Sequence, residues 1–246
     1  MLSLVFIFYR TLDLDHLERA IYSLARQTGL GLASELVFVD NNTAYEPEAI
    51  RAVVEPHFQE PFVKYHFLKH GVDSRRHSWS ANYGIRAAAN EDFFFTRADF
   101  ILMEDCLERM AMTARESQQP ALATGWGWYL ARSADEAGLH IDVPYEDYDW
   151  RNNVRALLQY PSSLRFHDTA LDAGVFVTSK AAIELGGWYD EAMINFGFQQ
   201  STLQRHMSNA GVYMVAIEDY LFCHQHHAAD RNFERAWDEY IHSRGG

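Results

Sequence analysis

Short apolar runs alternate with amphipathic segments along the first half of the chain. Residues 4–8, 36–39 and 93–95 are uninterrupted apolar stretches, which are typical of strands buried on both faces. Residues 63–67 alternate apolar and polar positions and also predict a strand. Between these runs, apolar spacing and capping residues predict helices between residues 13 and 29 and over about 47–55, 78–89 and 104–115.

This repeated strand–helix order predicts a mostly parallel α/β sheet, because parallel strands need helical crossovers. In doubly wound sheets, ligands bind just beyond the carboxyl ends of the strands. Three predicted strands end in polar residues: Tyr9-Arg10 after the first, Asp40 after the second, and Arg97 with Asp99 after the fourth. We therefore expect a ligand site at this edge, with Asp99 on its floor.

Both acids also have a local alternative. Asp99 would otherwise cap the helix that begins near Glu104. Asp40 would otherwise form a turn with the two asparagines that follow it.

The second half is less regular. Its patterns predict strands over 121–129, 173–178 and 212–217 and helices over 180–185 and 199–210, followed by a terminal helix with Phe233, Trp237 and Tyr240 on one face. Residues 133–170 are acidic and aromatic without a clear period, as in a segment that covers an open site or in a surface loop. We see no repeat or linker, so a single domain over residues 1–246 is expected.

Composition narrows the choice of partners. The net charge of −13 argues against binding to a nucleic-acid backbone and against general adsorption to anionic lipid. The two cysteines form no CxxC pair, which favours a reducing, cytoplasmic compartment. The apolar N-terminus is too short to span a membrane, so any membrane contact would be peripheral.

Several short motifs occur in a characteristic order: a helix ending at Gln27, a strand ending at Asp40, Asn-Tyr-Gly-Ile over 82–85, Thr-Arg-Ala-Asp over 96–99, Gly-Trp-Tyr-Asp-Glu over 187–191, Gly-Phe-Gln-Gln over 197–200 and a histidine cluster over 224–227. The ordered set covers most of the chain and resembles the family 2 glycosyltransferases, which have the GT-A fold. No single motif is specific; their order is.

The resemblance implies transfer of a sugar from a nucleoside diphosphate, with UDP favoured, to a hydroxyl acceptor, with inversion. Residues 1–118 would form the nucleotide-binding half and residues 119–246 the acceptor-binding half. Asp40 would lie near the uracil or ribose, with Tyr9, Arg10 and Asn82 also on the nucleotide.

The resemblance also implies a divalent cation at the diphosphate. Asp99 would be a ligand, with His224 or His226 completing the shell, and oxygen donors with one imidazole suit Mn²⁺ or Mg²⁺. A structural or solvated role for these histidines is the alternative.

Two departures from the family pattern change this picture. Arg97 stands where the first acid of Asp-x-Asp is usual, so its guanidinium could contact the diphosphate and make the metal weaker or dispensable. Alternatively, Arg97 turns away to pair with a surface acid. Gln199 and Gln200 stand where the family has Glu-Asp, and neither can take a proton at neutral pH.

The catalytic base must therefore lie elsewhere. We expect Asp190, then Asp172, with Glu191 as a further candidate, although Asp190 and Glu191 also suit a turn or cap. Trp126, Trp128 and Trp188 could stack on sugar rings or pack in the core.

Two other functions compete with the transferase. One is a GT-A domain that has lost turnover and binds a nucleotide, a sugar or a protein. The other, a nucleotidyltransferase, needs a glycine-rich loop after the first strand, and residues 9–12 contain no glycine.

Overall fold

The computed structural model describes residues 1–9, 12–69, 77–117, 119–130, 164–166, 174–192 and 199–225. In the first half the elements are β1 (Leu2–Tyr9), α1 (Leu14–Ala25), a 3-10 helix η1 (Thr28–Leu32), β2 (Ala33–Asn41), α2 (Pro47–Val54), β3 (Val63–Leu68), α3 (His77–Ala87), β4 (Asp92–Arg97), β5 (Phe100–Leu102) and α4 (Cys106–Glu116). The predicted strands and helices of this half are confirmed; η1 and β5 were not predicted.

Local chemistry explains where the first helices begin. The side chain of Asp13 accepts a hydrogen bond from the backbone N–H of His16, which caps α1. Pro47 occupies the first turn of α2, where its missing N–H costs nothing.

The second half adds β6 (Ala121–Leu130), β7 (Leu164–Phe166), β8 (Phe176–Ser179), α6 (Lys180–Gly186), α7 (Gln199–Asn209) and β9 (Tyr213–His224). Strand β9 extends well beyond the predicted 212–217 because it pairs with β6 along its length and with β5 near its end. The predicted terminal helix and all of the 133–170 segment except β7 lie outside the described residues.

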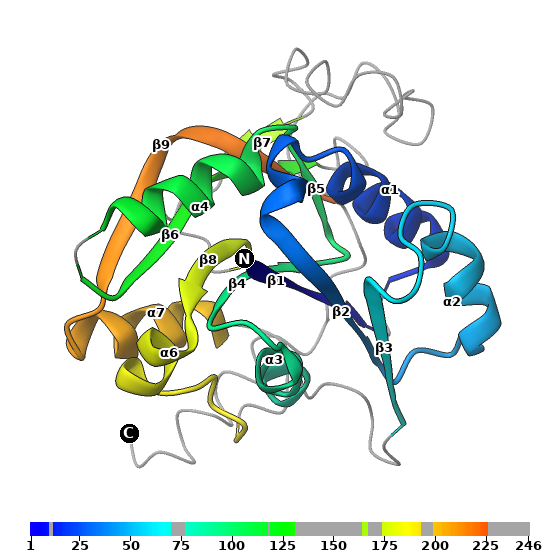
Figure 1. Cartoon of the computed structure of the whole chain (residues 1–246), viewed down its shortest axis with the longest axis horizontal. Coiled ribbons are helices and arrows are strands. Elements are labelled where there is room, and N and C mark those ends of the chain that lie inside the picture. The colour runs from blue at the N-terminus through cyan, green and yellow to red at the C-terminus, as the bar shows by residue number, and fades with distance from the viewer. Residues whose placement is uncertain are drawn as a thin grey trace.

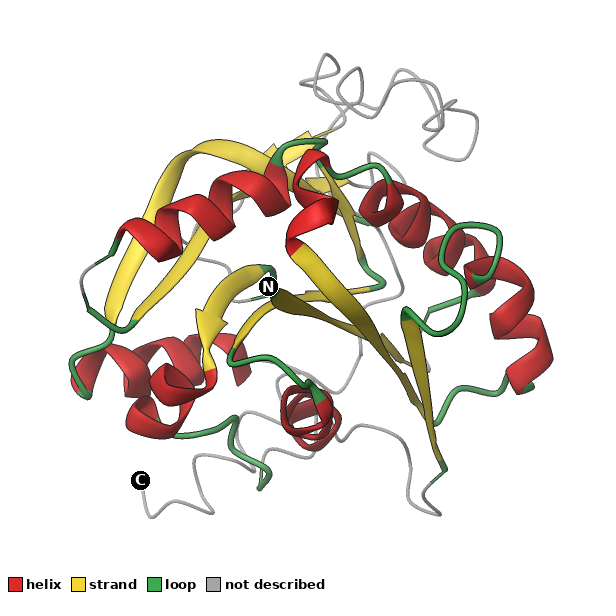
Figure 2. Ribbon diagram, viewed as in Figure 1, coloured by secondary structure: helices red, strands yellow, loops and turns green. Residues whose placement is uncertain are grey.

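The nine strands of the described residues form one sheet, in the order β3-β2-β1-β4-β8-β6-β9-β5, with β7 on β6. Strands β1 to β4 pair in parallel, whereas β8 is antiparallel to both β4 and β6. Strands β6 and β9 also pair in parallel, and most paired residues belong to parallel pairs, so the sheet is mostly parallel. It curls between helices on both faces (Figures 1 and 2).

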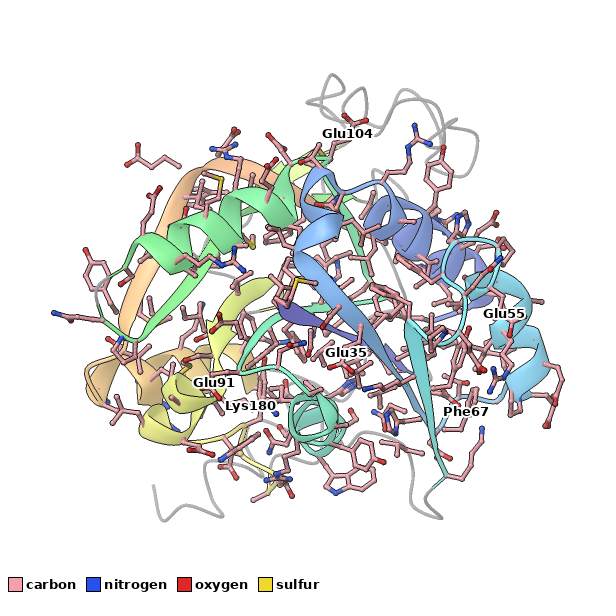
Figure 3. The ribbon with its side chains drawn as sticks, in the orientation of Figure 1. Glu35, Glu55, Phe67, Glu91, Glu104 and Lys180 are labelled. Atoms are coloured by element: carbon pink, nitrogen blue, oxygen red, sulfur yellow. The ribbon has the colours of Figure 1, made fainter. Side chains whose placement is uncertain are left out.

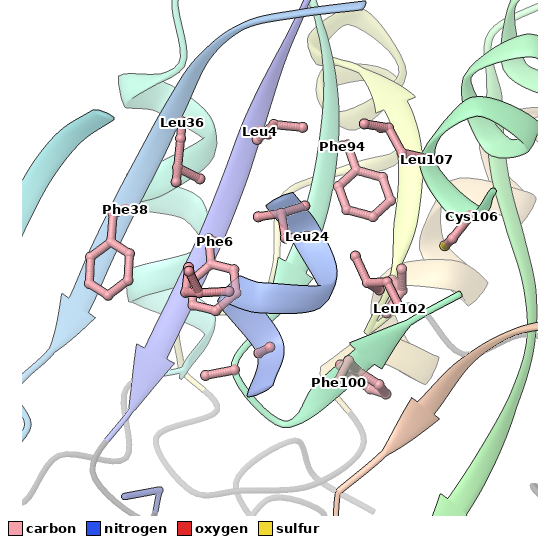
Figure 4. Close-up of a cluster of buried hydrophobic side chains, with 14 of the residues drawn as sticks. Leu4, Phe6, Leu24, Leu36, Phe38, Phe94, Phe100, Leu102, Cys106 and Leu107 are labelled. Carbon is pink, nitrogen blue, oxygen red and sulfur yellow. The ribbon is translucent and has the colours of Figure 1, made fainter. Parts of the chain in front are cut away.

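Two apolar cores lie on the two faces of this sheet. Leu4, Phe6 and Phe8 of β1 face the first core, where α1, α2 and α4 cover the sheet. Figure 4 shows Leu24 of α1 among side chains from several strands in this core. Val5 and Ile7 face the second core, which α3, α6 and α7 cover. Burial on both faces explains why β1 has no polar alternation.

Two residues of the ordered motifs have packing roles. Gly84 lets α3 approach the sheet, since a Cβ there would lie 2.8 Å from Cγ1 of Val5. The buried side chain of Gln27 donates to the Met103 carbonyl at 2.7 Å and accepts from the Leu107 N–H at 2.9 Å. Gln27 therefore joins the end of α1 to the start of α4.

Both cysteines, Cys106 and Cys223, are buried and reduced. Burial raises the pKa of Cys223 to about 12, so its thiol is not a nucleophile near neutral pH. None of the helices in the described ranges is both long and apolar enough to cross a lipid bilayer.

Glu35 is a buried acid near the start of β2 (Figure 3). Its carboxylate accepts hydrogen bonds from the Ser3 hydroxyl and the Ala89 N–H, both at 2.5 Å, and from the ammonium of Lys64. Burial alone raises the pKa of Glu35, but the bonds from Lys64, Ser3 and Ala89 outweigh it and hold this pKa below its ordinary value. These contacts join β1, β2, β3 and the end of α3.

We expect Glu35→Gln to lower the free energy of unfolding by about 1–3 kcal/mol at pH 7. The substitution removes the negative charge and places the NH2 group of the amide against a hydrogen-bond donor that the carboxylate had accepted from. Because the pKa of Glu35 is lower in the folded state, the stabilisation that its carboxylate provides is fully present above about pH 4.5. It is lost as the pH falls through the lowered pKa. Urea unfolding at pH 7 and near pH 3 measures both effects, with the exposed Glu184→Gln as control. Equal destabilisation by the two variants at pH 7 would contradict this account.

Candidate active site

The carboxyl ends of β1, β2 and β4 meet at one edge of the sheet. Strand β1 lies between the other two, with Phe8 opposite Asp40 and Ile7 opposite Arg97. Asp99 lies two residues beyond the end of β4. Two strand spacings separate β2 from β4, which is roughly 10 Å. The prediction that the two acids lie at a common edge is confirmed.

The carboxylate of Asp99 is completely buried and is shared by three side chains. Its Oδ2 accepts a hydrogen bond from the Tyr9 hydroxyl at 2.5 Å and lies 3.1 Å from Nη2 of Arg97 and 3.2 Å from Nε2 of His224. These partners come from the ends of β1, β4 and β9. We call Tyr9, Arg97, Asp99 and His224 the Asp99 cluster.

The structure decides between the alternatives for the orientation of Arg97 and for the capping role of Asp99. Arg97 is 7% exposed and pairs with the buried Asp99, so the alternative, in which it turns away to a surface acid, is wrong. Its guanidinium also lies 5.0 Å from the ring centre of Phe100. Asp105, not Asp99, occupies the N-cap position of α4.

Glycine at position 174 leaves room for this guanidinium. A Cβ at Gly174 would lie 2.6 Å from the Phe100 ring and 3.0 Å from Nη2 of Arg97. The backbone just before β8 therefore closes one side of the Asp99 cluster.

Asp40 forms a second polar group at the same edge. It is completely buried, and its Oδ1 accepts a hydrogen bond from the Thr43 N–H at 3.0 Å, as the turn alternative requires. Its Oδ2 lies 3.4 Å from Nζ of Lys69, which also donates to the Thr43 carbonyl at 3.0 Å. Lys69 was not predicted from the sequence, although it directly follows β3 and so belongs to the same edge.

Asn82 contacts a different part of the chain. Its amide donates to the Tyr189 carbonyl at 2.9 Å and to Oε1 of Glu191 at 2.8 Å, and its oxygen accepts from the Tyr189 N–H at 3.1 Å. Glu191 also pairs with Arg86 at 3.1 Å. Asn82 thus ties α3 to the 187–191 motif, and its nucleotide role stays a prediction.

The proposed bases are only partly placed. Asp190 is half-buried, and its Oδ1 accepts from the Ala192 N–H at 3.0 Å, as in a turn. Gln199 is buried at the start of α7. Asp172, Arg10 and His226 lie outside the described residues, so their roles also stay predictions.

The tryptophans give no support to sugar stacking. Trp188 is half-buried and packs against the second core, with the guanidinium of Arg86 4.6 Å from its ring centre. Trp126 is half-buried, and the side chain of Trp128 is outside the described part.

A divalent cation at Oδ2 of Asp99 does not fit this arrangement. That oxygen already contacts Tyr9, Arg97 and His224, and a cation bound there would be repelled by the guanidinium. Among the described residues, no group of three or more His, Cys, Asp or Glu side chains could hold a metal ion. The implied Asp99–His224 metal shell is therefore not what these side chains form.

The chemistry available to the Asp99 cluster is recognition and stabilisation of an anion. A guanidinium carries a permanent charge and five N–H donors, and a phenol and an imidazole add donors from other elements. Such groups stabilise negative charge that develops on a leaving phosphate.

We expect Tyr9→Phe to lower the free energy of unfolding by about 1.5–3 kcal/mol, because it removes a buried hydrogen bond to a carboxylate. Tyr65→Phe is the matched control, since the Tyr65 hydroxyl has no hydrogen-bond partner in the described part of the chain. Chemical unfolding of both variants measures the difference. A cost for Tyr9→Phe no larger than that for Tyr65→Phe would refute a stabilising contact with Asp99.

Comparisons with known proteins agree with this geometry. Residues 3–137, more than half of the chain, match the family described as "Glycosyl transferase family 2". No curated protein sequence matches the chain. Among solved structures, that of S. aureus TarS aligns with a TM-score of 0.62 at 13% identity, over 92% of this chain and 37% of the TarS chain.

At that identity, the likeness to TarS supports the fold alone, and this chain spans well under half of the TarS chain. The family match covers the strands that carry Tyr9, Asp40, Arg97 and Asp99. From this match and the curled, mostly parallel sheet, we conclude that the chain belongs to glycosyltransferase family 2 and has the GT-A fold.

Proposed function

We propose that the protein transfers a sugar from a nucleoside diphosphate, most favourably UDP, to a hydroxyl acceptor with inversion at the sugar carbon. The single observation that carries this proposal is the spacing of two buried carboxylates, those of Asp40 and Asp99, at one sheet edge. Asp40 with Lys69 and the Asp99 cluster lie two strands apart, roughly 10 Å. That separation suits the two ends of a nucleoside diphosphate.

In this proposal, Asp40 and Lys69 bind the nucleoside. A carboxylate accepts hydrogen bonds from a base N–H or a ribose hydroxyl, and a lysine donates to a base carbonyl. Tyr9 of the Asp99 cluster ends β1, which lies between β2 and β4, and we propose that Tyr9 and Arg10 also contact the nucleotide. Asn82 supports the site through its contacts with the 187–191 motif.

In this proposal, the Asp99 cluster binds the diphosphate. Departure of the sugar leaves an additional negative charge on the terminal phosphate, and Arg97 and His224 are the groups that would stabilise it. Arg97 would supply positive charge where the family pattern has an acid and a bound cation. We therefore propose that the requirement for Mn²⁺ or Mg²⁺ is weakened or absent.

Inversion needs a base that removes the acceptor proton as the hydroxyl attacks. We propose Asp190 for this role and keep Asp172 as its competitor. Glu191 is less suited, because it is held by Asn82 and by the guanidinium of Arg86. Residues 119–246 would bind the acceptor and residues 1–118 the donor.

A second candidate is a GT-A domain that binds a nucleotide sugar with little or no turnover. The Gln199-Gln200 pair favours it, because the acids usual at these positions are absent. In either case we propose no nucleic-acid partner, given the net charge of −13, and a cytoplasmic setting, given the two free cysteines.

The decisive experiment is a panel of nucleotide sugars with measurement of released nucleoside diphosphate. We expect release from at least one UDP-sugar, and at least about a hundredfold loss of rate in Asp40→Asn and Asp190→Asn. Glu184→Gln, an exposed change on α6, is the control. A thermal shift without any release would favour the binding domain, and an unaffected Asp190→Asn would move the base to Asp172.

Removal of metal tests the role of Arg97 separately. We expect the wild type to keep most of its transfer rate in excess EDTA. We expect the transfer rate of Arg97→Met to fall about a hundredfold or more, because this variant lacks the positive charge beside Asp99. Arg205→Met, an exposed change on α7, is the control.

Arg97→Asp restores the acid-x-acid pattern and should make the remaining activity depend on added Mn²⁺. Complete loss of wild-type activity in EDTA, with recovery on adding Mn²⁺, would overturn the proposed role of Arg97.

A further inference from the structure

Gln225 directly follows β9 and is completely buried. The sequence motif at this position had indicated only the histidines around it. We propose that Gln225 is a positioning residue that holds Asp99 and His224 in register for the diphosphate of the donor. This inference rests on the proposed function and adds a residue to its site.

The side chain of Gln225 connects α1 with the end of β4. Its Nε2 donates to the carbonyl of Ala98 at 2.9 Å and to that of His16 at 3.1 Å. Its Oε1 accepts from Nε of Arg19 at 2.8 Å. Because arginine can only donate, the atom facing Arg19 must be the oxygen, and the amide orientation is therefore unambiguous.

The backbone of Gln225 acts on the neighbouring residue. Its N–H donates to the Asp99 carbonyl at 2.7 Å, so one residue binds two successive carbonyls, those of Ala98 and Asp99. On the other side, the Ala98 N–H donates to the Ile7 carbonyl at 3.0 Å. The turn that carries Asp99 is thus held between β1 and Gln225.

The same residue fixes His224, which precedes it in the chain. His224 pairs with Phe100 across β5 and β9, and its ring packs edge-on against the Phe100 ring at 5.1 Å. Its Nε2 reaches Asp99 from this position. Movement of Gln225 would therefore displace both the carboxylate and the imidazole.

An apolar side chain could fill this buried space without burying an amide. The amide instead uses both N–H groups and its oxygen in directional bonds, and such fully bonded buried groups hold a unique geometry. Displacements of about 1 Å in an active site can cost about a hundredfold in rate, so a residue that prevents them matters without touching substrate.

The test compares binding of UDP with binding of uridine, which lacks the diphosphate. Gln225→Met keeps the length of the side chain and removes its hydrogen bonds. We expect it to weaken UDP binding about tenfold or more, because the groups that meet the diphosphate are displaced, and uridine binding less than about twofold. Calorimetric titration of UDP and NMR titration of uridine, at a temperature where each protein is folded, give both values.

Arg19→Met is a second variant, in case Gln225→Met does not fold; it removes the bond to Oε1 and leaves Gln225 in place. Arg19→Met should also weaken the binding of UDP more than that of uridine. In the double variant, the loss of UDP-binding free energy should be smaller than the sum of the losses in the two single variants, because both substitutions act through one amide. Gln59→Met, an exposed glutamine, is the control and should change neither affinity.

Equal weakening of UDP and uridine would show a general structural role and overturn the inference. Unchanged UDP binding in both variants would also overturn it, while leaving the proposed function intact. A wild-type protein that binds neither UDP nor uridine would instead refute the proposed donor, and this inference with it.

Discussion

The buried carboxylate of Asp99 is the interaction on which the site depends. A charge without solvent is costly unless it is paired, and this one is paired by a guanidinium, a phenol and an imidazole. These partners come from the ends of three strands that are distant in sequence. Satisfying one oxygen therefore brings β1, β4 and β9 together at the same edge, and the same contacts place the groups that would meet a phosphate.

Arg97 stands where the family pattern has an acid, and this difference alters the charge at this edge of the sheet. Two acids would leave a negative site that a divalent cation could neutralise. Arg97 neutralises Asp99 from within the protein and occupies the space beside its Oδ2. The GT-A scaffold is retained, because the strands and helices around the site do not depend on which cation sits there.

Much of the first half could be predicted from the pattern of side chains. The apolar run of β1 indicated burial on both faces, and the structure has one core on each face. Asp13 and Pro47 marked the starts of their helices. Strand β5 was missed because three residues give no period, and the length of β9 was missed because it depends on pairing with β5 and β6.

The site was predictable in its location and not in its contacts. The order of strands and helices was enough to bring Asp40 and Asp99 to one edge, since parallel crossovers return the chain in one direction. Only the tertiary structure decided that Arg97 turns inward, that Lys69 reaches Asp40, and that Gln225 clamps the turn before β5. These contacts join residues far apart in the chain, and their geometry depends on how strands pair and helices pack, which periodicity along a single segment does not encode.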